Sequence, residues 1–153
     1  MVFAIGNPSR GDDAIGPELA ARLAAAALPG VEVIVDFQLQ IEHALDLEDR
    51  RLAVFVDAAV DADPPFELRP VRACRDSSHT THALSPAAVL ETFERCTGQS
   101  APPAWALAVR GDHFELGAAL SAAARANLEA AWPRLVELGQ ACAWGSPARQ
   151  AAN

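Results

Sequence analysis

The sequence predicts an α/β protein: a three-layer sandwich in which an open, largely parallel or mixed sheet of about five strands carries helices on both faces. Short apolar runs alternate along the chain with segments of helical spacing, which is the pattern of βαβ units. The run at 52–59 is apolar on both sides, as expected of a strand covered by two helical layers. A length of 153 residues suits one domain, which we place over residues 1–153.

The first half of the chain is expected to alternate strands with helices. A buried strand that ends at Gly6 precedes a helix in which Pro17 is tolerated because it lies in the first turn. Pro29 and Gly30 end this helix, and the β-branched run "VEVIVD" predicts the next strand. In order, the elements are strand 2–6, helix 15–28, strand 31–36, helix 41–47 and strand 52–59.

The second half is expected to continue this alternation. Pro70 suits an edge strand, because proline has no N–H to donate within a sheet. Ser85 as N-cap and Pro86 at the first helical position mark a helix start, whereas Pro133 should kink or divide the last helix. In order, we expect strand 65–73, helix 85–96, loop 97–103, strand 105–111, helix 118–139 and a frayed polar tail from about residue 143.

The composition excludes several classes of partner. The formal net charge is −8, from 20 acidic and 12 basic residues, and every basic residue is an arginine. An acidic chain without a basic stripe is not expected to bind nucleic acid, because phosphate neutralisation supplies most of that affinity. We expect no membrane-spanning helix and no signal peptide. The 3 cysteines include no CxxC pair, which predicts reduced, partly buried thiols in a cytoplasmic protein.

The stretch "GNPSRGDDAIGP", residues 6–17, has the glycines of a phosphate-binding loop but the wrong charge. It contains neither GxGxxG nor GxxxxGK[ST], and the chain contains no GxSxG of a serine hydrolase. We therefore expect its small and polar residues to shape a tight strand-to-helix turn. These turn-shaping residues are Gly6, Asn7, Gly11, Asp12 and Gly16.

Acidic residues follow the first predicted strand and end the second and third, and a histidine-containing loop follows the fourth. The positions are Asp12, Asp13, Asp36, Asp57, His79 and His82. In a sheet with a parallel centre these groups share one edge, where ligands of such sheets bind. Neighbouring carboxylates repel unless a cation joins them. Two carboxylates and an imidazole suit a divalent ion such as zinc, nickel or manganese, with coordination positions left open.

Each of these residues also has a simpler structural interpretation. An acid at the start of a helix is favoured by the helix dipole, which accounts for Asp12 and leaves Asp13 open. Asp36 is also explained as a turn former and Asp57 as a cap of the next turn. A histidine in a loop is commonly a surface residue. No single residue decides between the two interpretations.

Four segments together resemble the [NiFe]-hydrogenase maturation endopeptidases. They are "GNPSRGDDAIGPELAARL" near the N-terminus, an aspartate that closes the second strand, "FVDAA" in the third, and "SSHTTHALSP". The similarity covers about residues 2–140 in order. The segments "DFQLQIEHALDL" (36–47) and "GDHFELG" (111–117) most resemble the branch that serves soluble or bidirectional, NAD(P)-linked hydrogenases.

The resemblance implies an endopeptidase that removes the C-terminal extension of the nickel-loaded hydrogenase large-subunit precursor, the last step of active-site maturation. It implies that Asp13, Asp57 and His82 contact the metal and are catalytic, with His79 as the runner-up for the histidine. Nickel is expected to arrive with the substrate, and no organic cofactor is expected. The expected partner is the large-subunit precursor, and the protein is expected to be a cytoplasmic monomer.

The match departs after the second strand, where many family members have "DGGT" and this chain has Asp36 followed by "FQLQ". We interpret this as a difference in substrate specificity and assign Asp36 and Gln38 to substrate binding. Two other functions remain open. One is a non-catalytic, nickel-dependent docking or chaperone module for hydrogenase assembly, and the other is a metallo-aminopeptidase or amidohydrolase.

Overall fold

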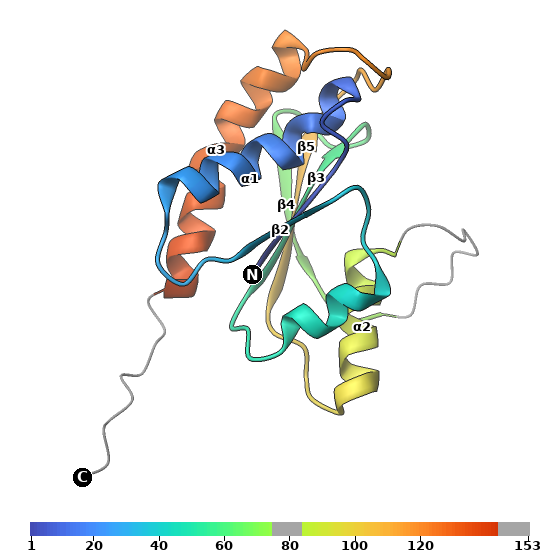
Figure 1. Ribbon diagram of the computed structural model, residues 1–153, viewed down its shortest axis with the longest axis vertical. Helices are drawn as coiled ribbons and strands as arrows, with labels where there is room; N and C mark the ends of the chain where they lie inside the picture. Colours follow the sequence, from blue (N-terminus) through green and yellow to red (C-terminus); the bar gives the residue numbers. More distant parts are fainter. Residues whose placement is uncertain (75–83, 144–153) are drawn as a thin grey trace.

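Strands and helices alternate along the chain as the sequence predicts (Figure 1). The computed structural model describes residues 1–74 and 84–143. In chain order its elements are β1 (Val2–Ile5), the 3-10 helix η1 (Gly11–Ala14), α1 (Ile15–Ala26), β2 (Val33–Asp36), the 3-10 helix η2 (Ile41–Leu47), β3 (Ala53–Ala59), β4 (Phe66–Val71), α2 (Pro86–Thr97), β5 (Ala104–Arg110) and α3 (Ala122–Ala143).

The strands of the described residues form one 5-stranded sheet in the order β2-β1-β3-β5-β4. β1 pairs in parallel with β2 and β3, and β3 pairs in parallel with β5. β4 is antiparallel to β5 and lies at the edge of the sheet, as Pro70 predicts. The expected largely parallel, mixed sheet with β3 at its centre is therefore confirmed.

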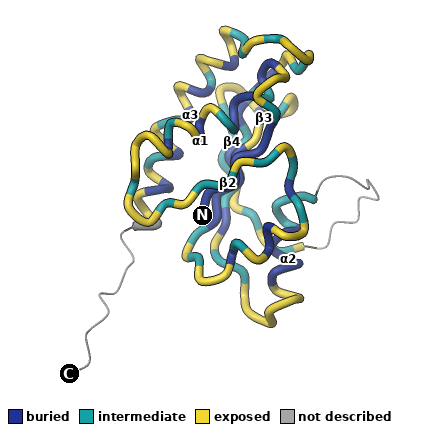
Figure 2. Tube along the Cα trace, in the orientation of Figure 1, coloured by how far each residue is buried: buried dark blue, intermediate teal, exposed yellow. Residues whose placement is uncertain are grey.

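Helices cover both faces of this sheet, and each face has its own apolar core. Because successive side chains of a strand point to opposite faces, Val54 and Val56 pack with α1 and α3, whereas Phe55 packs with η2 and α2. On the second face the rings of Phe3 and Phe55 stack with centroids 5.1 Å apart. Figure 2 shows buried residues concentrated along the strands between the helical layers. The expected three-layer sandwich is confirmed.

Of the two helices predicted in the second half, one begins where expected and the other begins later. α2 starts where expected, with the Ser85 hydroxyl accepting the N–H of Ala88 at 3.2 Å. α3 starts at Ala122 rather than near residue 118, because the Ser121 hydroxyl accepts the N–H of Ala124 at 3.1 Å and caps the helix there. Pro133 lies inside α3 without dividing it.

Other expectations are corrected or fall outside the described part of the chain. Cys74 and Cys96 are exposed, so the expectation of partly buried thiols is wrong for both. The polar tail lies almost entirely outside the described residues, which end at 143. In the described residues, no helix combines the length and the apolar character needed to cross a membrane.

Candidate active site

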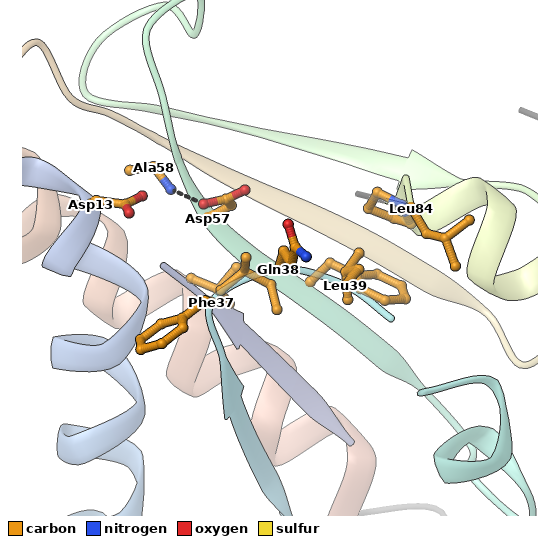
Figure 3. Close-up of a pocket in the computed structure, with 11 residues that line it drawn as sticks. Asp13, Phe37, Gln38, Leu39, Asp57, Ala58 and Leu84 are labelled. Carbon is orange, nitrogen blue, oxygen red and sulfur yellow. Dashed lines mark hydrogen bonds between the residues drawn. The ribbon is translucent and has the colours of Figure 1, made fainter. Parts of the chain in front are cut away.

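A pocket of about 360 Å³ opens at the carboxyl edge of the parallel strands (Figure 3). The loop after β1 contributes Asp13, and β3 contributes Asp57. The segment after β2 adds Phe37, Gln38 and Leu39, and residues at the start of α2 close another side. This edge is where open α/β sheets bind their ligands.

Asp13 is held in place by the beginning of its own loop. The N–H of Asn7 donates to Oδ2 of Asp13 at 2.9 Å, and Oδ1 of Asn7 accepts the N–H of Ser9 at 2.9 Å. Gly6 has a φ of +140°, and a Cβ on it would lie 2.0 Å from the carbonyl oxygen of Asp13. Any side chain at position 6 would therefore push the loop away from the contact that orients Asp13.

The other predicted turn-shaping glycines lie in the same strand-to-helix turn. A Cβ on Gly16 would lie 2.1 Å from the carbonyl oxygen of Ile5, so α1 begins in direct contact with the end of β1. The N–H of Gly11 donates to the carbonyl oxygen of Ala118 at 3.1 Å. Between these two glycines, η1 carries both aspartates of the motif.

Asp57 lies within β3, which continues to Ala59, and its Oδ1 accepts the N–H of Ala58 at 2.8 Å. Part of its side chain reaches solvent at the pocket mouth, but most of the volume around the carboxyl group is filled by protein rather than water. This burial raises the pKa of the Asp57 carboxyl to about 7; the Ala58 N–H lowers the pKa, and the negative charge of Asp13 raises it. The two carboxylates thus repel each other across the pocket, and a shared cation would relieve that repulsion.

Asp12 faces away from this pocket and is completely buried. Its carboxylate accepts the backbone N–H groups of Asp112 at 2.9 Å, His113 at 3.0 Å and Ser121 at 2.8 Å, and the Ser121 hydroxyl at 3.1 Å. Burial alone would raise the pKa of Asp12, but these hydrogen bonds outweigh it and hold the pKa below its usual value. Asp12 therefore fixes the segment between β5 and α3 to the turn, which goes beyond the turn-shaping role expected of it.

The two predicted substrate-binding residues lie in adjoining pockets. Gln38 lines the pocket of Asp13 and Asp57, and in Figure 3 its side chain extends toward Asp57. Asp36 instead lines a smaller neighbouring pocket together with Phe37. One carboxylate oxygen of Asp36 accepts the N–H of Phe37 at 2.6 Å, and the other lies 3.5 Å from Nε2 of the buried His43.

The predicted histidines, His79 and His82, lie outside the described residues. We expected the fourth strand to end at the shared edge, and this is wrong for β4. β4 is antiparallel, so its last residue, Val71, pairs with Ala104 at the opposite edge. The described chain reaches the pocket again at Leu84. Within the described residues, no group of three or more His, Cys, Asp or Glu side chains is placed to hold a metal ion.

Sequence reasoning missed several residues around this pocket. Phe37, Leu39 and Leu84 line it, but apolar side chains carry no chemical signature that marks a site. His43 was missed as the partner of Asp36. Its Nδ1 accepts the N–H of Gln40 at 2.9 Å at the start of η2, and a polar residue three positions before a histidine was the available signal.

No protein-family model matches the sequence, and no curated protein sequence matches it. Solved structures do match the fold. The hydrogenase maturating endopeptidase HybD from E. coli matches with a TM-score of 0.68 and 21% sequence identity, over 89% of this chain and 88% of that chain. The [NiFe] hydrogenase maturation protease HycI from Thermococcus kodakarensis KOD1 matches with a TM-score of 0.65 and 21% identity, over 91% of this chain and 90% of that chain.

A third match is the hydrogenase 2 maturation peptidase from Thaumarchaeota archaeon SCGC_AB-539-E09, with a TM-score of 0.62 and 20% identity. It covers 94% of this chain and 96% of that chain. The likeness therefore extends over most of each protein. The chain has the fold of the hydrogenase maturation endopeptidases.

Proposed function

We propose that this protein is an endopeptidase that removes the C-terminal extension from the nickel-loaded precursor of a [NiFe]-hydrogenase large subunit. The observation that supports this most directly is the meeting of Asp13 and Asp57 in one pocket at the carboxyl edge of the sheet. Solved structures with the same fold are named as hydrogenase maturation endopeptidases. The sequence motifs that carry Asp13, Asp57 and His82 resemble the same family.

In this proposal Asp13, Asp57 and His82 bind nickel that is already held by the precursor, so the metal is part of the substrate. Two carboxylates and one imidazole leave the soft thiolate ligands to the precursor. Nickel bound in this way would polarise the scissile carbonyl group or a water molecule. One of the aspartates accepts the proton of the attacking water, and that proton then passes to the amine of the leaving peptide.

The proposal extends to the substrate, the assembly and the location. Gln38 faces the pocket and Asp36 stands beside it, so both are proposed to contact the precursor. The segments 36–47 and 111–117 favour a precursor from a soluble, NAD(P)-linked hydrogenase. We further propose that the protein acts as a monomer in the cytoplasm.

The decisive experiment compares nickel-loaded and nickel-free precursor from the same genome, each incubated with the protein and analysed by intact mass. A loss of mass that matches a C-terminal peptide, only in the nickel-loaded sample, is the expected result. Nickel-dependent binding without a change in mass would identify a docking module instead. Turnover of small peptides by protein that carries its own metal would identify a metallo-aminopeptidase or amidohydrolase.

A further inference from the structure

β2 forms one edge of the sheet, and its outer side has no strand partner among the described residues. On its inner side, the N–H of Val2 donates to the carbonyl oxygen of Glu32 at 2.8 Å, and the N–H of Gly6 donates to that of Asp36 at 3.0 Å. Backbone groups of successive residues point alternately to the two sides of a strand. The N–H and C=O groups of Val33 and Val35 therefore point outward, away from β1.

The opposite edge of the sheet is built differently. β4 carries Pro70, which cannot donate to a further strand, and Glu67 and Arg69 form an ion pair on it. Proline and charged side chains are the usual devices that prevent another chain from adding to a sheet edge. β2, with the sequence Val-Ile-Val-Asp, contains no proline, and its one charged residue, Asp36, is the last of the strand. The β4 edge is thus protected against the addition of a further strand, whereas the β2 edge is open to it.

Apolar side chains beside the β2 edge are unusually exposed. Val35 is 53% exposed and Phe37 is 68% exposed. Among the described residues, the large hydrophobic side chains that remain exposed are Val35, Phe37, Ile41, Leu45, Val60 and Leu116. Val35 and Phe37 line one pocket beside Asp36, whereas Ile41 and Leu45 belong to a separate pocket against α2. Exposed apolar side chains that lie next to each other indicate an interaction surface, whereas single scattered ones do not.

This surface is continuous with the candidate active site through one residue. Phe37 lines the pocket that contains Asp13 and Asp57, and it also lines the smaller pocket formed with Val35 and Asp36. A main chain that followed the outer side of β2 would therefore arrive at Phe37 and at the mouth of the active-site pocket.

We propose that the segment of the precursor next to the scissile bond binds along the outer side of β2 in extended conformation, as an additional strand of the sheet. Its backbone groups hydrogen-bond to the N–H and C=O groups of Val33 and Val35, and its side chains pack against Val35 and Phe37. This inference rests on the proposed function, since it takes the precursor as the partner. An extended main chain is also the form in which a peptide bond can enter the pocket and reach Asp57.

The first test separates the backbone contact from the side-chain contact at Val35. Val35→Pro removes an N–H that no β1 bond uses, and proline is tolerated at such an edge position. It should raise the KM for cleavage of the nickel-loaded precursor about tenfold, as expected from lost backbone hydrogen bonds. Val35→Thr keeps the N–H and the branched shape and should raise KM less. Val60→Thr, the same change at an exposed valine away from β2, should leave KM as in the wild type.

The second test measures protection of the β2 backbone without relying on catalysis. Amide hydrogen exchange is measured for Asp57→Asn protein, alone and with nickel-loaded precursor that it cannot cleave. Slower exchange at Val33 and Val35 in the presence of precursor supports the added strand. Unchanged exchange at both residues, together with cleavage by the wild type and a wild-type KM for Val35→Pro, overturns it and leaves the proposed function standing.

Two other outcomes also decide the matter. Slow exchange at these residues that depends on protein concentration without precursor, with a dimer in sedimentation, would show that a second copy of this chain occupies the edge, and would overturn the inference. Failure of the wild type to shorten the nickel-loaded precursor would instead overturn the proposed function, and this inference with it.

Discussion

The carboxylate of Asp12 accepts both the backbone N–H and the hydroxyl of Ser121, at 2.8 and 3.1 Å, across 109 positions of sequence. Ser121 is also the N-cap of α3, so one buried acid joins the first turn of the fold to its last helix. The neighbouring residue, Asp13, faces the active-site pocket. The position of Asp13 therefore depends on the segment between β5 and α3, because that segment holds the neighbouring Asp12 in the same turn.

We expect Asp12→Asn to destabilise the protein by about 3 kcal/mol, because buried N–H donors lose a charged acceptor and meet an amide in its place. Ser121→Ala removes only the hydroxyl bond and the cap and should cost about 1 kcal/mol. Chemical denaturation of both variants beside the wild type measures the difference. Equal stability of Asp12→Asn and the wild type would show that the buried network contributes nothing.

The pH dependence of stability should carry the signature of Asp57. Its pKa in the free, folded protein is raised to about 7 from a reference value of 3.8. The folded state therefore holds the proton more tightly than the unfolded state, and this contribution to stability is full below pH 3.8 and is lost as the pH rises through 7. Asp57→Asn, which cannot ionise, should show a smaller decline of unfolding free energy between pH 5 and about 8. Parallel curves for the two proteins would contradict the raised pKa.

Gly6→Ala should destabilise the protein by about 3 kcal/mol or more, because the new Cβ would overlap the carbonyl oxygen of Asp13 at 2.0 Å. Gly98→Ala is the matched control. Gly98 also has a positive φ, of +69°, but nothing lies within 4 Å of the added Cβ, so only the backbone cost of about 1 kcal/mol remains. Thermal unfolding of the two variants measures how much more Gly6→Ala costs than a substitution at a positive φ without steric overlap, and equal losses would exclude the overlap.

Alanine at Asp13, Asp57 or His82 should leave a folded protein whose rate of precursor processing falls at least about a hundredfold. Far-UV circular dichroism checks the fold, and intact mass measures the processing. His79→Ala tests the choice between the two histidines, and it should process the precursor far better than His82→Ala. If all three alanine variants cleave normally, the assignment of these residues is wrong.

Local sequence patterns predicted most of the fold because helix capping, proline geometry and apolar spacing depend on neighbouring residues alone. The Ser85–Pro86 pair marked the start of α2, and Pro70 marked an edge strand. The start of α3 was missed because an apolar and small-residue run preceded Ser121 and resembled the helix itself. The direction of β4 was also missed, since residues 65–73 alternate in the same way whether the strand is parallel or antiparallel.

The candidate site was predictable only in part. Asp13 follows β1 and Asp57 lies in β3 just beyond the last residue that pairs with β1, so their meeting at one edge follows from the parallel pairing of the two strands. The hydrogen-bond partners of Asp12 lie 100 and 109 residues further along the chain, and no local pattern around Asp12 indicates them. Asp36 ends β2 as expected, but its contact with His43 depends on how η2 packs on the sheet.

The sheet separates two apolar cores that share no helix. Asp13 is held in the turn between β1 and α1 by the N–H of Asn7, whereas Leu39 and Leu84, which line another part of the pocket, pack with the layer of η2 and α2. Mutations that repack the second layer can therefore change the pocket wall formed by Leu39 and Leu84 while Asp13 and Asp57 keep their positions. The two walls of the pocket thus rest on separate cores, so that substitutions in one core need not disturb the wall that the other supports.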